Sequence, residues 1–137
     1  MIYQTQTTSF KAELPQGIHD LLTDTIKFAL YTENADLSES TLVYTTANEV
    51  SGGGYTAGGV ILTGVTINSS GSTAYVSFDN PAWSPASFTA TGGLIYNASK
   101  ANRSVAVLSF GGNKTATNTL TVELPPNTVT SALLRFT

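Results

Sequence analysis

The chain has one histidine, His19, followed directly by Asp20, and this is where acid–base chemistry would first be sought. A general base needs an imidazole within reach of its substrate and a second group that orients it. No GxSxG turn accompanies any serine, so a serine triad built on this histidine is not indicated. We therefore expect His19 to be a surface or helix-capping residue. We also expect a protein that is not an enzyme.

The carboxylates are scattered along the chain. Asp20 and Asp24 are four residues apart, so they would share one face of a short helix. Asp36 and Glu39 lie in a polar stretch that lacks the oxygen-rich spacing of a calcium loop. No pair stands out as the two carboxylates of a glycosidase. The sequence has no cysteine, which removes thiolate ligands as well. We therefore predict no metal and no cofactor.

Two glycine-rich stretches invite comparison with phosphate-binding loops. Residues 51–59 read SGGGYTAGG, and GGNKT begins at Gly111. Neither ends in Gly-Lys-Ser/Thr, and neither joins a strand to a helix as a dinucleotide-binding turn does. We interpret both as structural loops.

Four residues are candidates for binding a partner: Tyr55, Trp83, Lys100 and Arg103. Exposed in loops, Tyr55 and Trp83 would stack on a sugar ring or anchor a protein interface. The alternative for Trp83 is that it caps one end of the core. Lys100 and Arg103 are two of only six basic residues and would form a cationic tip for an acidic partner. The alternative is that both basic side chains are only solvated and bind no partner.

The elements that must hold these residues centre on residues 92–112. Two apolar runs, 94–96 and 105–110, are joined by a polar link and bracketed by glycine pairs, which we expect to turn the chain. Strand alternation puts Val105 and Val107 on one side. The other side then receives Ala106, Leu108 and Phe110. Because both sides are apolar, this strand should lie inside the fold.

Further elements follow from periodicity and turn residues. Strands are predicted at 10–14, 26–31, briefly at 42–46, and at 120–124 and 132–136. A hairpin is predicted from 60–67 and 73–78 with a five-residue link, one or two helical turns at 18–24, and a segment outside any sheet at 81–85.

Composition agrees with an all-β protein. Charged residues make up 11% of the 137 residues, and threonine, serine and asparagine supply the remaining polarity. We predict one domain, 1–137, with eight or nine strands. It should be a jelly-roll-like antiparallel β-sandwich with one or two short helical turns. Residues 1–9 are a candidate extended N-terminal arm.

Charge and hydropathy bear on partners and location. The net charge of -3 leaves no basic surface for phosphates, so nucleic-acid binding is not expected. The N-terminus has neither the basic start nor the apolar run of a signal peptide, and no segment has the length of a membrane span. We expect no membrane association and a protein made in a cytoplasm.

Two stretches resemble a known group of proteins: YTTANEVSGGGYTAGGVILTGVTI (44–67) and AYVSFDNPAWSPASFTATGGLIYNASKANRSVAVLSFGG (74–112). They are similar to the capsid cement or decoration proteins of tailed bacteriophages, small proteins encoded among the head genes. The resemblance extends from about Phe10 to the C-terminus. It carries no catalytic signature. It implies a β-sandwich that clamps major capsid protein subunits from outside and associates with itself at a capsid symmetry axis.

The resulting hypothesis is a structural virion protein on the capsid exterior, assembled in the cytoplasm of the host bacterium. Its partners would be the major capsid protein and further copies of itself, as a dimer or trimer. The strand-like end segments, residues 3–10 and 131–137, would add to a neighbour's sheet edge. The alternative is a carbohydrate-binding or adhesion module of a phage tail or head fibre.

Overall fold

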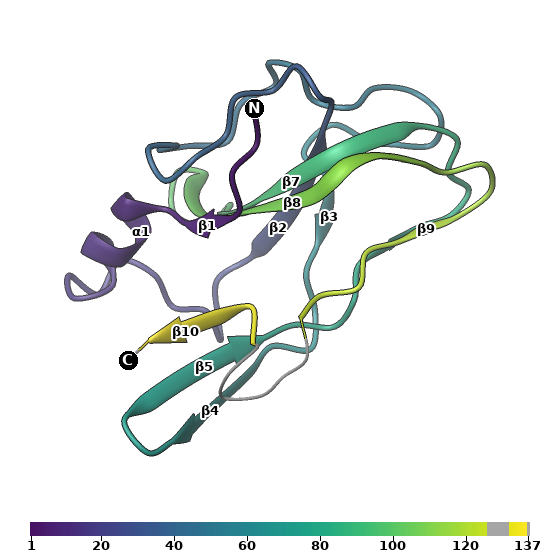
Figure 1. The fold of residues 1–137 in the computed structure, drawn as a ribbon. Helices are drawn as coiled ribbons and strands as arrows, with labels where there is room; N and C mark the ends of the chain where they lie inside the picture. Colours follow the sequence, from purple (N-terminus) through teal and green to yellow (C-terminus); the bar gives the residue numbers. More distant parts are fainter. Residues whose placement is uncertain (126–131, 137) are drawn as a thin grey trace.

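A computed structural model of the chain describes residues 1–125 and 132–136, which form antiparallel β-sheets and one short helix (Figure 1). The prediction of an all-β protein is confirmed. The elements are β1 (Thr5–Gln6), α1 (Thr8–Glu13), β2 (Ile26–Tyr31), β3 (Val60–Ile61), β4 (Thr66–Ser70), β5 (Thr73–Ser77), β6 (Ala82–Trp83), β7 (Thr89–Asn97), β8 (Arg103–Thr115), β9 (Leu120–Thr121) and β10 (Leu134–Phe136). These residues hold more strands than expected because β1, β3, β6 and β9 have only two residues each.

The strands form three sheets. The largest has the order β1-β8-β7-β2-β3, the second β10-β5-β4, and the third pairs β6 with β9. The pairing of β7 with β8 is the longest, and the two strands lie side by side at the centre of their sheet (Figure 1). The prediction that this pair is central is confirmed.

The core has two parts. Its main cluster combines Phe28 and Ile95 of the five-stranded sheet with Val76 and Leu134 of the three-stranded sheet. A smaller cluster, including Tyr31, packs with side chains of the N-terminal segment and the following loop. Strands β2, β7 and β8 contribute to both clusters, so the middle of this sheet is buried on both faces, as predicted for β8.

A β-bulge changes the predicted faces of β8. Tyr96 pairs with Ser104 and Ile95 pairs with Ala106, which leaves Val105 without a partner in the register. The extra residue rotates the chain locally. Val105 therefore packs in the main cluster with Ala106, and not in the smaller cluster with Val107 as strict alternation predicts.

The glycine pairs lie inside strands, so the prediction that they turn the chain is wrong. Gly92 and Gly93 belong to β7, while Gly111 and Gly112 belong to β8. A Cβ atom on Gly93 would overlap the ring of Phe28. This glycine is required because the neighbouring strand's aromatic ring packs directly over the backbone.

Residues 8–13 are helical, which corrects the predicted strand at 10–14. Thr7 is the N-cap, and its Oγ1 accepts a hydrogen bond from the amide of Phe10 at 3.4 Å. Phe10 is fully buried and Leu14, one turn later, packs against the main cluster. The apolar spacing of four residues is that of a helix face, and Pro15 follows the C-cap.

The predicted helix at 18–24 is a hydrogen-bonded turn instead. The Asp20 carboxylate accepts from the amide of Leu22 at 3.1 Å, and the Asp24 carboxylate accepts from the amide of Asp20 at 2.9 Å. Aspartate side chains that bond nearby amides compete with helix formation. The prediction of a helix is wrong for this reason.

The predicted hairpin is present but shorter and tighter. β4 runs through Ser70 and β5 begins at Thr73, so the link has two residues and not five. Gly71, with φ of +59°, supplies the left-handed conformation of such a turn. Residues 60–61 pair with β2 in the other sheet, so they are not part of the hairpin.

Three smaller predictions also change. Ala82 and Trp83 pair with β9, so the segment 81–85 does enter a sheet. The stretch 42–46 makes only a single bridge, from Val43 to Arg103. The strand predicted at 120–124 is limited to β9.

Residues 1–9 are not an extended arm. Ile2 bridges to Leu37, β1 pairs with β8, and the amide of Thr7 donates to the carbonyl of Val105 at 3.0 Å. The burial of Ile2 and Thr7 explains this docking, because a free arm would leave both in water. At the other end β10 pairs with β5 of the same chain; residues 131 and 137 of the predicted terminal strand lie outside the described part.

Candidate functional site

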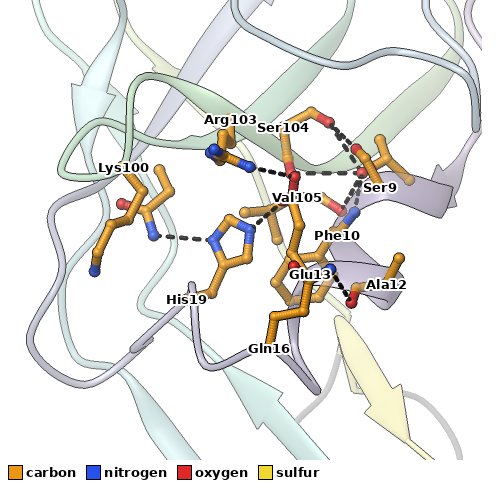
Figure 2. Close-up of polar contacts among 12 residues, drawn as sticks. Ser9, Phe10, Ala12, Glu13, Gln16, His19, Lys100, Arg103, Ser104 and Val105 are labelled. Carbon is orange, nitrogen blue, oxygen red and sulfur yellow. Dashed lines mark hydrogen bonds and ion pairs between the residues drawn. The ribbon is translucent and has the colours of Figure 1, made fainter.

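Six polar residues from five parts of the chain meet beside the central hairpin, and we name them the His19 cluster. Its members are Glu13 at the end of α1, His19 and Asp24 in the connection to β2, Asn97 at the end of β7, Lys100 in the hairpin link and Arg103 at the start of β8. Figure 2 shows the His19 ring with Glu13 and Arg103 close to it.

His19 is held on both sides of its ring. Nε2 lies 2.7 Å from Oε1 of Glu13, and Nδ1 lies 3.0 Å from Nδ2 of Asn97. The side chain has no exposed area, and the ring of Phe10 packs against it edge-on with centroids 4.9 Å apart. The prediction of a surface or capping histidine is therefore wrong.

The hydrogen-bond partners define which ring nitrogen carries the proton. Asn97 Oδ1 accepts from the amide of Ser99 at 3.0 Å, and Asn97 Nδ2 also donates to Asp24 at 2.8 Å, so the amide has one orientation. Nδ1 of His19 therefore accepts from Asn97. The proton lies on Nε2 and is donated to Glu13.

Each carboxylate of the cluster is paired with one basic side chain. Arg103 Nη1 donates to Glu13 Oε2 at 2.7 Å, and Lys100 Nζ donates to both oxygens of Asp24 at 2.9 and 2.8 Å. The Glu13 and Asp24 side chains are only 14% and 9% exposed. The cluster therefore joins two nearly buried anions to two cations at the solvent boundary.

The pKa values of both carboxyl groups are lowered by these bonds. Burial alone would raise the pKa of Asp24, but hydrogen bonds from Asn97 and Lys100 outweigh it and lower this pKa to about 2. Burial opposes ionisation of Glu13 too, and hydrogen bonds with His19 and Arg103 hold its pKa below the ordinary value. Both groups are carboxylates at neutral pH.

The geometry of the cluster is that of a structural cross-link. A catalytic imidazole needs a nitrogen directed at a substrate, whereas both nitrogens of His19 are bonded to protein. The nearby Ser104 hydroxyl is also committed, because it donates to the carbonyl of Thr41 at 2.6 Å. The cluster holds α1 and the 18–24 turn against the central hairpin.

A second polar cluster, around Glu49, holds the glycine-rich loop. The Glu49 carboxylate accepts from the hydroxyls of Tyr44, at 2.6 Å, and of Tyr55, and from the amide of Gly58 at 2.8 Å. Tyr55 in turn accepts from the amide of Leu30 at 3.0 Å. This loop is thus tied to β2 by a carboxylate and a phenol, in agreement with the interpretation of residues 51–59 as structural.

The tyrosines around Glu49 are held in their neutral form. Burial, and then the hydrogen bond with Glu49, raises the pKa of Tyr55. Burial and the charge of Glu49 together raise the pKa of Tyr96 to about 12. The ring of Tyr44 stacks on that of Tyr96 with centroids 4.7 Å apart. Nothing in the spacing of these residues along the sequence indicated this cluster.

The structure separates the four candidate partner-binding residues into two pairs. Tyr55 and Trp83 are 8% and 5% exposed, so the premise of exposed aromatics is wrong and the core alternative for Trp83 describes its place. Trp83 Nε1 is buried without a hydrogen-bond partner in the described residues. Lys100 and Arg103 are each paired with a carboxylate of the same chain, Lys100 with Asp24 and Arg103 with Glu13.

Beside the His19 cluster lies an apolar groove of about 440 Å³. Leu21, Leu22 and Leu14 line one wall; Ile67, Val76 and Phe136 of the three-stranded sheet line the other. Leu22 and Ile67 are 64% and 45% exposed. His19 and Asp20 also line the groove, and its apolar walls offer surface to another molecule.

Among residues 1–125 and 132–136, no group of three or more histidine, cysteine or acidic side chains is arranged to hold a metal ion. The helix in this part of the chain is too short to cross a membrane. Comparisons with models of protein families, with characterised proteins and with solved structures find no match to this chain.

Proposed function

We propose that this chain is a structural protein of a bacteriophage virion, which decorates the capsid exterior and stabilises contacts between major capsid protein subunits. The proposal starts from the resemblance carried by residues 44–67 and 74–112. These residues supply most of β5, all of β7 and most of β8, so the resemblance lies in the framework of the fold. The protein would reach the virion by assembly in the cytoplasm of the host bacterium.

The observation that supports the proposal most is the internal use of ionisable groups. In the His19 cluster, the histidine, both carboxylates and both cations bond to other groups of this chain. In the Glu49 cluster the carboxylate accepts three hydrogen bonds from this chain. These internal bonds make the domain rigid. Its contacts with capsid subunits would then depend on the shape of its surface and on backbone groups.

Charge favours the outside of the shell over the inside. The chain carries 9 acidic and 6 basic residues, and Lys100 and Arg103 are already paired with carboxylates. A surface facing packaged DNA would need uncompensated basic side chains to neutralise phosphates. An acidic protein is suited to the exterior.

For the fold, we propose a jelly-roll-like sandwich of the five-stranded and three-stranded sheets. The support is the shared core: Phe28 of β2, Val105 of β8, and Val76 and Leu134 of the smaller sheet belong to one cluster. Inner faces of two sheets that share one core are the mark of a sandwich. An experimental structure with these residues in two facing layers would establish it.

The adhesion alternative depends on two exposed aromatic side chains, and both of these side chains are buried. Tyr55 and Trp83 are both in the main core cluster and present little area to a sugar ring. We therefore favour the capsid role.

The proposal is tested on particles of the phage that encodes the chain. Quantitative mass spectrometry of purified virions should find hundreds of copies per particle, since a decoration protein covers the shell. Shells lacking the protein should lose resistance to heat and low salt and regain it when purified protein is added. A handful of copies, or shells equally resistant without the protein, would refute the role.

A further inference from the structure

Strand β4 is the longest of the edge strands in the described part of the chain. In the sheet β10-β5-β4, strand β4 pairs only with β5, and all five of its residues are exposed. Figure 1 shows the β4–β5 hairpin extending away from the central sheet, with β4 on its outer side. The opposite edge is partly covered, because Gln6 Nε2 donates to the carbonyl of Arg135 in β10 at 3.2 Å.

The turn determines which backbone groups of β4 face outward. A two-residue link places Ser70 and Thr73 in a pair that exchanges both hydrogen bonds. The pattern then alternates, so Asn68 also bonds inward to β5. The amide and carbonyl groups of Ile67 and Ser69 are left pointing away from the sheet.

This edge lacks the features that usually prevent strand addition. Natural edge strands carry charged side chains, proline or a bulge. Residues 50–78 contain no charged residue and no proline. The register between β4 and β5 runs without a shift from Thr66 to Ser70.

We propose that the β4 edge is the self-association surface, and that two copies of this chain pair through it in antiparallel fashion. The inference goes beyond the proposed function and rests on the self-association that the resemblance implies. A two-fold axis at Asn68 sets Ile67 of one copy opposite Ser69 of the other, and the reverse. The outward backbone groups of these two residues then meet as pairs that exchange both hydrogen bonds.

The edge fits a second copy because it is complementary to itself. The two Asn68 side chains meet across the axis, where one amide group can donate to the other. No like charges are brought together, because none lie on the hairpin. Pairing would join two three-stranded sheets into one continuous six-stranded sheet.

The interface is small, so the dimer should be weak. Stable complexes bury about 1,200–2,000 Å² in total, and five residues a side with Ile67 as the main apolar contact supply less. The free protein should therefore form a weak dimer, visible at high concentration. On a surface that holds many copies, effective concentration would make the same contact persistent.

The test compares Ser69→Pro with Ser69→Ala in the full chain. Proline removes the outward amide without removing a bond to β5, whereas alanine leaves the amide in place. In analytical ultracentrifugation the wild type and Ser69→Ala should dimerise with similar constants. Ser69→Pro should dimerise at least about tenfold more weakly, since two hydrogen bonds per dimer are lost. Equal dimerisation of all three proteins would overturn the proposal.

A second measurement decides the matter if Ser69→Pro does not fold. In the wild-type protein, hydrogen exchange at the amides of Ile67 and Ser69 should slow as protein concentration rises. The amide of Asn68, bonded inward, should change far less. A wild-type protein that stays monomeric at every concentration, with no change in exchange at Ile67 and Ser69, would overturn pairing between copies. The copy number in virions would be unaffected by that result, so the capsid role is judged separately.

Discussion

Nε2 of His19 lies 2.7 Å from Oε1 of Glu13, and the same carboxylate receives Arg103 at its other oxygen, also at 2.7 Å. Through Glu13, the connection after α1 is joined to the first residue of β8, ninety positions along the chain. Replacing any member leaves buried polar groups without partners, which costs more than the net contribution of the bond itself.

Substitution of the histidine should reveal this cost. His19→Ala removes a fully buried ring and leaves Glu13 Oε1 and Asn97 Nδ2 each without one bond. We expect the free energy of unfolding to fall by about 2–4 kcal/mol. Urea unfolding followed by circular dichroism measures it. Lys11→Ala, at an exposed position of α1, is the matched control and should change stability by less than about 0.5 kcal/mol.

The lowered pKa of Asp24 predicts how stability depends on pH. Its folded pKa is about 2 against an ordinary value of 3.8, so the unfolded chain takes up the proton first. The stabilisation is complete above the ordinary value and is lost as the pH falls toward 2. It amounts to about 2 kcal/mol. Glu13, with its lowered pKa, acts in the same direction.

The Asp24→Asn variant isolates the contribution of the Asp24 carboxylate to the pH dependence of stability. The variant should be about 2 kcal/mol less stable than the wild type at pH 7, and the difference should shrink as the pH approaches 2. Urea titrations between pH 2 and 7 give both curves. Asp36→Asn, whose carboxylate is 91% exposed, serves as the control. A difference between Asp24→Asn and wild type that stays constant over this range would contradict the assignment.

Gly93 should tolerate no side chain. A Cβ atom there overlaps the Phe28 ring and lies 2.7 Å from the carbonyl oxygen of Ala29. We expect Gly93→Ala to destabilise the protein by about 3 kcal/mol or to prevent folding. Gly111→Ala provides the comparison, because its left-handed φ of +77° adds strain of about 1–2 kcal/mol while no atom lies within 4 Å. Thermal unfolding measures both losses of stability. Equal losses for Gly93→Ala and Gly111→Ala would show that steric overlap at Gly93 does not add to the cost.

The hydroxyl of Tyr55 should matter although its ring is buried. Tyr55→Phe leaves the ring in the core but removes the bond to Glu49 and the acceptor for the amide of Leu30. We expect a loss of about 1–3 kcal/mol. Amide exchange should quicken in the glycine-rich loop. Tyr3→Phe, on a half-exposed ring, should have no measurable effect on either.

The central strands could be predicted from the sequence because both of their faces are apolar or alternate clearly. β2, β7 and β8 have this pattern, and their apolar side chains are mostly buried. α1 could not be predicted because a buried Phe10 and a half-buried Leu14 in so short a segment fit either a strand or a helix. The helix begins with the hydrogen bond from the Phe10 amide to the Thr7 side chain. The periodicity of apolar residues carries no information about this bond.

The His19 cluster could not be predicted for a different reason. Its members are ordinary surface residue types taken one at a time, and they meet only because β7 and β8 bring positions 97–103 back beside positions 13–24. The four-residue spacing of Asp20 and Asp24 predicts a shared helix face. Its real role, with each carboxylate bonding an amide of the turn, gives no periodic signal.

The pairing of β1 with β8 governs the order in which the protein is completed. Thr5 finds its partner at Val107, so about one hundred residues must be made before the first strand has a place to bind. At 5–20 residues per second, this takes roughly 5–20 s on the ribosome. During that time β1 and the apolar Phe10, which shares the main core cluster with Val105, lack their neighbours in β8. Production of this protein should therefore depend on what shields its first ten residues while the rest is synthesised.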